Sequence, residues 1–122
     1  MMSVDRTLLF RVALVLALLG IGYLATSPTD AVLPATNDKL KHIAAFLLLA
    51  YLSDAAFPRQ SWNWRKFIPL LGYGLLLECI QYFEPTRFFS LADLVADAVG
   101  LGLYPLLRVV LNQVRVRFQG QA

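Results

Sequence analysis

The sequence predicts an all-α membrane protein, a bundle of four transmembrane helices with both termini in the cytoplasm. Three observations predict this fold: an apolar composition, four apolar runs of spanning length, and an uneven distribution of Lys and Arg. Hydrophobic residues make up 58% of the 122 residues and charged residues only 16%, whereas a soluble domain carries about 25% charged residues. The mean hydropathy is +0.60. The composition therefore favours lipid as the solvent, and the length predicts one domain over residues 1–122.

Four apolar runs, separated by prolines, predict the helices, and each is near the roughly 17–25 residues that a spanning helix needs. They cover about residues 8–25, 40–57, 67–83 and 91–111. The first run is expected to be a retained helix rather than a cleaved signal peptide, because Arg11 interrupts it and no small-residue cleavage site follows. Pro105 is expected to kink the fourth helix or to loosen its last turns. The tail after residue 111 is expected to lie at the inner membrane surface or to be disordered.

The distribution of Lys and Arg predicts the topology, because cytoplasmic loops of membrane proteins are enriched in these residues. With the N-terminus inside, eight of the 11 basic residues fall on the cytoplasmic side: Arg6, Arg11, Arg59, Arg65, Lys66, Arg108, Arg115 and Arg117. Lys39, Lys41 and Arg87 fall on the outer side. Both termini are therefore expected to be cytoplasmic, and the net charge of +3 has its simplest cause in this bias.

The composition also limits the partners. No basic patch interleaved with aromatic residues is present, so no nucleic-acid partner is predicted. Cys79 is the only cysteine, so an intramolecular disulfide is excluded and the thiol alone does not make a zinc site. The sequence predicts no cofactor and no metal, and it leaves open whether the chain forms a homo-oligomer.

Three pairs of polar residues share helical faces at spacings of three or four residues: Asp38 with His42, Glu78 with Gln81, and Asp93 with Asp97. The predicted topology places all three pairs, and the loop before the fourth helix, near the outer face. Ionisable groups inside a membrane usually face the bundle interior or a wet cavity and pair with one another. We therefore expect one polar pocket in the outer leaflet. Its predicted ligand-binding residues are Lys39, His42, Glu78, Gln81, Arg87, Ser90, Asp93 and Asp97.

A structural role for the same residues stays open, as hydrogen bonds that hold the helices together. Such bonds contribute about 0.6 kcal/mol on average in membranes, whereas inserting a central Asp costs about 2.5–3.5 kcal/mol. This comparison favours a ligand or catalytic role. Asp54, near the inner end of the second helix, is expected to pair with Arg59 or Lys66 instead. Four glycines are expected to allow close helix contacts: Gly72, Gly74, Gly100 and Gly102.

Two stretches carry these residues in order: residues 37–46 read NDKLKHIAAF, and residues 78–100 read ECIQYFEPTRFFSLADLVADAVG. Together they resemble the VanZ-like family of small polytopic bacterial membrane proteins. The family pattern has an acid-Lys-x-x-His run, then Glu-x-x-Gln, an Arg, and Asp-x-x-x-Asn/Asp-x-x-Gly. These fall here on Asp38, Lys39, His42, Glu78, Gln81, Arg87, Ser90, Asp93, Asp97 and Gly100. The chain departs from the pattern at Asp97, where the family often has Asn, and at Leu77, where another acid sometimes stands.

The resemblance implies a multi-pass protein of the bacterial cytoplasmic (inner) membrane with a role in the cell envelope. The member that gave the family its name is linked to glycopeptide resistance. The leading hypothesis is that the pocket binds or modifies an anionic or glycosylated envelope component, namely a membrane lipid or a lipid-linked molecule.

Other functions stay open. A membrane enzyme acting on a lipid phosphate would use His42 as nucleophile or general base and Arg87 as phosphate clamp, with Glu78 or Asp93 carrying the proton. The catalytic candidates are thus His42, Glu78 and Asp93. Carboxylates could also hold a divalent metal, although no ligand spacing demands one. A structural partner protein without a ligand is a further alternative. A proton path is least favoured, because helices three and four carry no ionisable groups that continue it inward.

Overall fold

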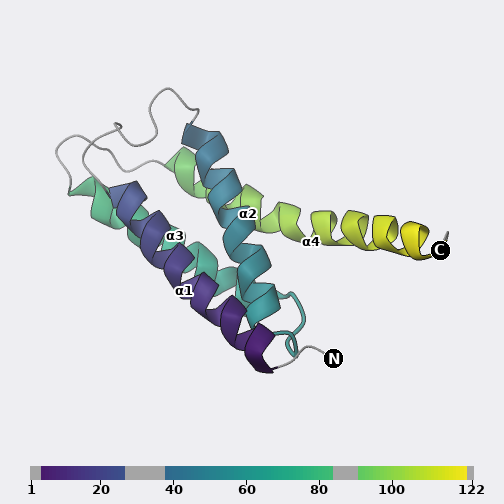
Figure 1. Cartoon of the computed structure of the whole chain (residues 1–122). Coiled ribbons are helices and arrows are strands. Elements are labelled where there is room, and N and C mark those ends of the chain that lie inside the picture. Colours follow the sequence, from purple (N-terminus) through teal and green to yellow (C-terminus); the bar gives the residue numbers. More distant parts are fainter. Residues whose placement is uncertain (1–3, 27–37, 84–90, 121–122) are drawn as a thin grey trace.

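The computed structural model describes residues 4–26, 38–83 and 91–120. These residues form four α-helices: α1 (Val4–Thr26), α2 (Asp38–Ala56), α3 (Trp64–Tyr82) and α4 (Leu91–Gly120). Successive helices run in opposite directions, so that α2 and α4 begin at the same end of the bundle (Figure 1). The predicted all-α fold of four helices is therefore confirmed. Two predicted site residues, Arg87 and Ser90, lie outside the described residues.

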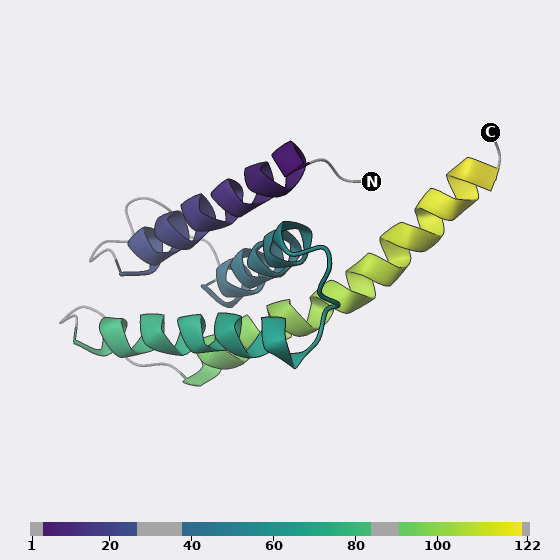
Figure 2. The same ribbon diagram turned by 90° about the horizontal axis from the view of Figure 1, so that it is seen from below.

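Helix α2 is the centre of the bundle and contacts α1, α3 and α4. Figure 2 shows it lying between α1 and the other two helices. Its Phe46, Leu49 and Ala50 are at most 1% exposed, and Leu101 of α4 is fully buried against them. The apolar core is therefore built around one face of α2, which fixes the position of the polar residues at its start.

Helix α1 packs on the edge of the bundle through hydrogen bonds to backbone carbonyls as well as apolar contacts. The hydroxyl of Tyr73 on α3 donates to the carbonyl oxygen of Leu18. At the other end of α1, Nε of Arg11 donates to the carbonyl oxygen of Ala56 over 2.9 Å, and its guanidinium lies 4.9 Å from the centre of the Phe57 ring. These contacts tie α1 to both α2 and α3.

Helix α4 is longer than predicted. It continues through Pro105 and ends at Gly120, beyond the expected end near residue 111, so the predicted loosening of its last turns is wrong, whereas the alternative expectation of a kink at Pro105 stays a prediction. Its C-terminal half projects away from the other helices (Figure 1). Residues 106–119 are exposed. An internal proline removes a backbone hydrogen bond and costs about 3 kcal/mol, yet it does not end α4.

Two of the four described helices are long and apolar enough to cross a membrane, judged by length and composition alone. These stretches are Arg6–Ala25 in α1 and Leu91–Gln119 in α4. Helices α2 and α3 have 19 residues each and carry seven charged residues between them, toward the two ends of the helices. These are Asp38, Lys39, Lys41, Asp54, Arg65, Lys66 and Glu78. Membrane crossing by α2 and α3 stays a prediction.

Candidate polar binding site

Five of the predicted site residues gather at the end of the bundle where α2 and α4 begin. Lys39 and His42 lie on the first turns of α2, Asp93 and Asp97 on the first turns of α4, and Glu78 on the last turns of α3. The five residues are Lys39, His42, Glu78, Asp93 and Asp97, here called the polar cluster. Three helices therefore contribute to one site, as the helical spacing predicts.

Ion pairs connect α2 to α4 within the cluster. Nζ of Lys39 contacts Oδ1 of Asp93. Nδ1 of His42 lies 2.6 Å from Oδ1 of Asp97, and its Nε2 lies 3.6 Å from Oδ2 of Asp93. An ionised carboxylate only accepts hydrogen bonds, so with Asp97 ionised the Nδ1–H group of His42 is the donor of this bond. The other ring nitrogen, Nε2, therefore faces Asp93.

The five side chains of the cluster differ in how far they are buried. The side chain of Lys39 is 47% exposed, whereas those of His42 and Asp93 are 17% and 16% exposed. Glu78 and Asp97 are 0% and 1% exposed. A ligand that reaches the cluster from outside would meet the ammonium group first and the buried carboxylates last.

Two glycines make room for this arrangement. A Cβ on Gly100 would lie 2.5 Å from the carbonyl oxygen of Ile43, so α4 approaches the backbone of α2 as closely as a glycine allows. A Cβ on Gly74 of α3 would lie 2.6 Å from Oδ2 of Asp97. The expected close contacts at these two positions are confirmed. Gly72 and Gly102 have nothing within 4 Å of such a Cβ, so they do not mediate helix contacts among the described residues.

Gln81 is buried but makes a different contact from the one predicted. Its Nε2 donates to the carbonyl oxygen of Ala25 on α1 over 2.5 Å. The amide thus joins α3 to the last turn of α1, and its predicted role in ligand binding remains a prediction. The same holds for Arg87 and Ser90, which the sequence places between α3 and α4.

A second polar network lies at the opposite end of the bundle. Lys66 is 6% exposed, and its Nζ donates to Oδ1 of Asp54 over 2.6 Å and to the carbonyl oxygen of Gln60 over 2.6 Å. The other oxygen of Asp54 accepts from the Tyr104 hydroxyl over 2.5 Å and lies 3.2 Å from Nη1 of Arg108. The predicted pairing of Asp54 with Lys66 is confirmed. Because each charge has several partners, this network is best explained as structural.

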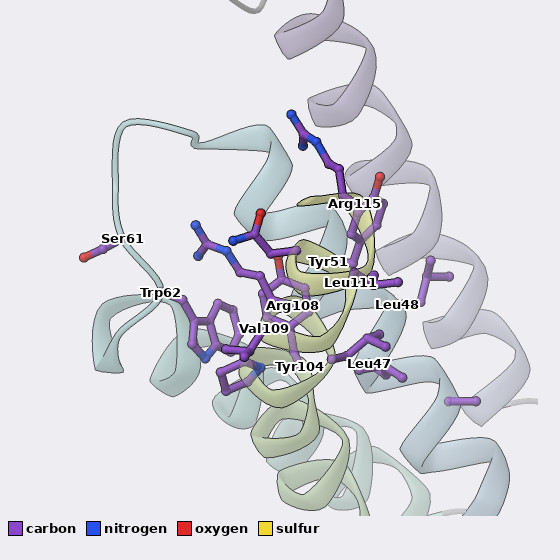
Figure 3. Close-up of a pocket in the computed structure, with 14 residues that line it drawn as sticks. Leu47, Leu48, Tyr51, Ser61, Trp62, Tyr104, Arg108, Val109, Leu111 and Arg115 are labelled. Atoms are coloured by element: carbon purple, nitrogen blue, oxygen red, sulfur yellow. The ribbon is translucent and has the colours of Figure 1, made fainter. Parts of the chain in front are cut away.

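A groove with a volume of about 920 Å³ lies beside that network, between α2, α4 and the segment before α3. Leu47 and Leu48 of α2 form part of its apolar lining, and Arg108 and Arg115 of α4 add positive charge (Figure 3). The sequence reasoning missed this groove. One signal was present, because Arg108, Asn112 and Arg115 recur at spacings of four and three residues and so share a helical face.

The polar cluster combines the groups needed for several kinds of chemistry. Its carboxylates accept hydrogen bonds from hydroxyl groups, and the Lys39 ammonium binds phosphate oxygens. His42, oriented by Asp97, has the arrangement of a general base. Comparison of the chain with protein-family models, with curated proteins and with solved structures finds no match.

Proposed function

We propose that this chain is a multi-pass protein of the bacterial cytoplasmic membrane, related to the VanZ-like family, whose polar cluster binds the headgroup of an envelope lipid. The observation that carries the proposal is the convergence of five ionisable side chains from three helices at one end of an apolar bundle. Ionisable groups at such positions are costly in a membrane and usually serve function. The ordered motifs of the sequence support the family relationship and the envelope role.

The proposed topology has four crossings, with both termini in the cytoplasm and the polar cluster in the outer leaflet. The alternating directions of the helices support it, since the network of Lys66 and Arg108 lies at the opposite end from Lys39. A fluorescent protein fused to the C-terminus is expected to fluoresce, and alkaline phosphatase at the same position to be inactive. The opposite pair of results would place the cluster in the inner leaflet and refute the topology.

The charges of the cluster favour a glycosylated headgroup. Glu78, Asp93 and Asp97 supply three carboxylates, against one ammonium group from Lys39 and one imidazole from His42. A purely anionic headgroup would meet more negative than positive groups among the described residues. Sugar hydroxyls, by contrast, donate hydrogen bonds to carboxylates. We infer that Lys39, together with Arg87 from the segment between α3 and α4 in the sequence, binds the lipid phosphate while the carboxylates hold the sugar.

Native mass spectrometry of the detergent-purified protein tests this assignment. The probes are a glycosylated lipid phosphate, the same lipid phosphate without the sugar, and phosphatidylethanolamine. We expect retention to fall in that order. Lys39→Met and Arg87→Ala should weaken retention of both lipid phosphates, and Asp93→Asn should weaken mainly the glycosylated one. Arg115→Gln, at the far end of α4, is the matched control. Equal retention of all three lipids by the wild type and every variant would refute the proposal.

A structural role is the second candidate, because both Lys39–Asp93 and His42–Asp97 bridge α2 to α4. In that case the cluster holds the bundle together and binds nothing. This alternative predicts that Asp93→Asn lowers the unfolding midpoint and leaves lipid retention unchanged. A folded Asp93→Asn variant with reduced retention of the glycosylated lipid excludes it.

A further inference from the structure

One imidazole nitrogen and two carboxylate oxygens in the polar cluster are arranged like the ligands of a metal ion. One ligand atom each from His42, Glu78 and Asp93 lies within 4.8 Å of the other two. Ligand atoms that share a tetrahedral metal at about 2.1 Å are separated by about 3.4 Å. The three side chains therefore need to close by no more than about 1.4 Å.

The hydrogen bond of His42 is an independent observation that points to the same ligand. Metal-binding histidines almost always donate their second ring N–H to a carboxylate or carbonyl, which fixes the tautomer and the ring orientation. Here Nδ1 lies at hydrogen-bond distance, 2.6 Å, from Oδ1 of Asp97, which is only 1% exposed. Nε2 is thereby left toward Asp93, 3.6 Å from its Oδ2. Asp97 thus orients the imidazole through Nδ1, so that Nε2 lies toward the carboxylate of Asp93.

The packing around Asp97 shows that this orientation is built into the fold. Gly74 leaves the space that the Asp97 carboxylate occupies, because a Cβ there would lie 2.6 Å from Oδ2. Gly100 holds α4 against the backbone of α2 at Ile43, one residue after His42. The positions of the aspartate and the histidine are therefore set by helix packing rather than by their mutual attraction alone.

We propose that His42, Glu78 and Asp93 bind a divalent first-row transition metal, with Asp97 positioning the imidazole. The donor set of one nitrogen and two oxygens suits Zn²⁺ or Mn²⁺ better than Mg²⁺, which prefers oxygen ligands only. The two carboxylate charges balance the charge of the ion. This site goes beyond the proposed lipid function and does not require it, although a metal here would lie beside a bound headgroup.

The metal competes with Lys39, which contacts Asp93. An ammonium and a divalent cation cannot share the same carboxylate oxygen without repulsion. Because Lys39 is about half exposed, its side chain can turn toward solvent when the ion enters. Removing its charge is therefore expected to tighten metal binding, whereas the same change weakens phosphate binding. The Lys39→Met variant therefore distinguishes the two proposals, because it should raise the affinity for the metal and lower the affinity for the lipid phosphate.

The decisive measurement uses the single histidine of the chain. The protein is labelled with ¹⁵N-histidine, purified on a tag without histidine in a Cys79→Ser background, stripped with chelator and titrated with ZnCl₂. The exposed thiol is removed because a cysteine thiolate is a zinc ligand and would compete for the added ion. We expect one equivalent of Zn²⁺ to shift the Nε2 resonance and leave Nδ1 protonated, and equal Mg²⁺ to leave both unchanged. Unshifted resonances at excess Zn²⁺ would overturn the proposal.

Variants then assign the ligands by calorimetric titration with Zn²⁺. Glu78→Gln and Asp93→Asn are each expected to raise the Kd at least tenfold. Asp97→Asn is expected to raise it about 10–100-fold, as for other groups that orient a ligand. Lys39→Met should lower the Kd severalfold, and Asp5→Asn, at the opposite end, should leave it unchanged. If both Glu78→Gln and Asp93→Asn fold and leave the Kd for Zn²⁺ unchanged, the assignment of these residues as metal ligands is overturned. Failure to bind zinc would leave the proposed lipid binding standing, and failure to bind lipid would leave the proposed metal site standing.

Discussion

The Nδ1 atom of His42 lies 2.6 Å from Oδ1 of Asp97, and the two residues are 55 positions apart in the sequence. This hydrogen bond joins the first turns of α2 and α4, the two helices that begin at the polar end of the bundle. It orients the only imidazole of the chain toward the remaining carboxylates of the polar cluster. The pair is therefore both a helix contact and the organising element of the candidate site.

Substitutions of Asp97 separate its hydrogen bond from its charge. Asp97→Leu leaves the His42 N–H without an acceptor in a buried position, and we expect it to lower the free energy of unfolding by about 1–3 kcal/mol or more. Asp97→Asn keeps an acceptor oxygen and is expected to cost less than half as much. Unfolding in mixed micelles, followed by circular dichroism, measures both. Equal losses would mean that the hydrogen bond does not hold the two helices.

Gly100 and Gly102 form a matched pair on the same helix. Gly100→Ala places a Cβ 2.5 Å from the carbonyl oxygen of Ile43, so α2 and α4 must separate, and we expect a loss of about 1–3 kcal/mol of stability. Gly102→Ala meets nothing within 4 Å and should gain up to about 1 kcal/mol, because alanine favours a helix more than glycine. The same unfolding assay checks both. Similar effects of the two substitutions would contradict the close contact.

The buried ammonium of Lys66 depends on Asp54. Its side chain is 4% exposed, so Asp54→Ala leaves a buried charge without its counter-ion, and we expect a loss of about 3–5 kcal/mol. Arg59→Ala is the control, since Arg59 was the alternative partner and is exposed; its effect should stay within about 0.5 kcal/mol. The double variant Asp54→Leu with Lys66→Met should recover most of the loss. Failure to recover would show that Lys66 has a role beyond this pairing.

Docking of α1 depends on side chains of α3. Tyr73→Phe removes the hydroxyl that donates to the Leu18 carbonyl, and Gln81→Leu removes the amide that donates to Ala25. Each is expected to lower stability by about 0.5–1.5 kcal/mol. Tyr82→Phe, at a 65% exposed position, should be nearly neutral. If Gln81→Leu instead abolishes lipid retention at unchanged stability, the amide belongs to the ligand site, as the sequence predicts.

The sequence was sufficient for the existence of the four helices, which follows from local periodicity, and for most of the polar cluster, which also needs the order of the helices. Asp93 and Asp97 share a face by spacing alone, and the alternating helix directions bring His42 of α2 to the same end. Contacts between helices were harder to predict. A Cβ on Gly100 would meet the backbone of α2, whereas one on Gly102 would meet nothing within 4 Å among the described residues, because of how α4 is rotated about its own axis against α2. The sequence of one helix does not specify that rotation.

The end of α4 could not be predicted for a related reason. Pro105 is a strong local signal for a break, yet the helix continues to Gly120. The groove beside Arg108 and Arg115 exists only because this extension leaves the bundle at an angle to α2. Such a groove depends on the relative directions of two helices. The spacing of Arg108 and Arg115 indicates that they share a helical face, but it does not indicate that a groove lies beside them.

Lys39 and Asp93 are 54 residues apart in the sequence, and if α2 crosses the membrane as proposed, this separation has a consequence for how the chain is made. At a synthesis rate of about 5–20 residues per second, the acidic partner leaves the ribosome about 3–11 s after the basic one. During that interval Lys39 and His42 at the start of α2 have neither Asp93 nor Asp97 as a partner. On the proposed topology, the basic residues at the start of α2 would gain these partners only when α4 is made, so stable insertion of α2 is expected to follow the synthesis of α4.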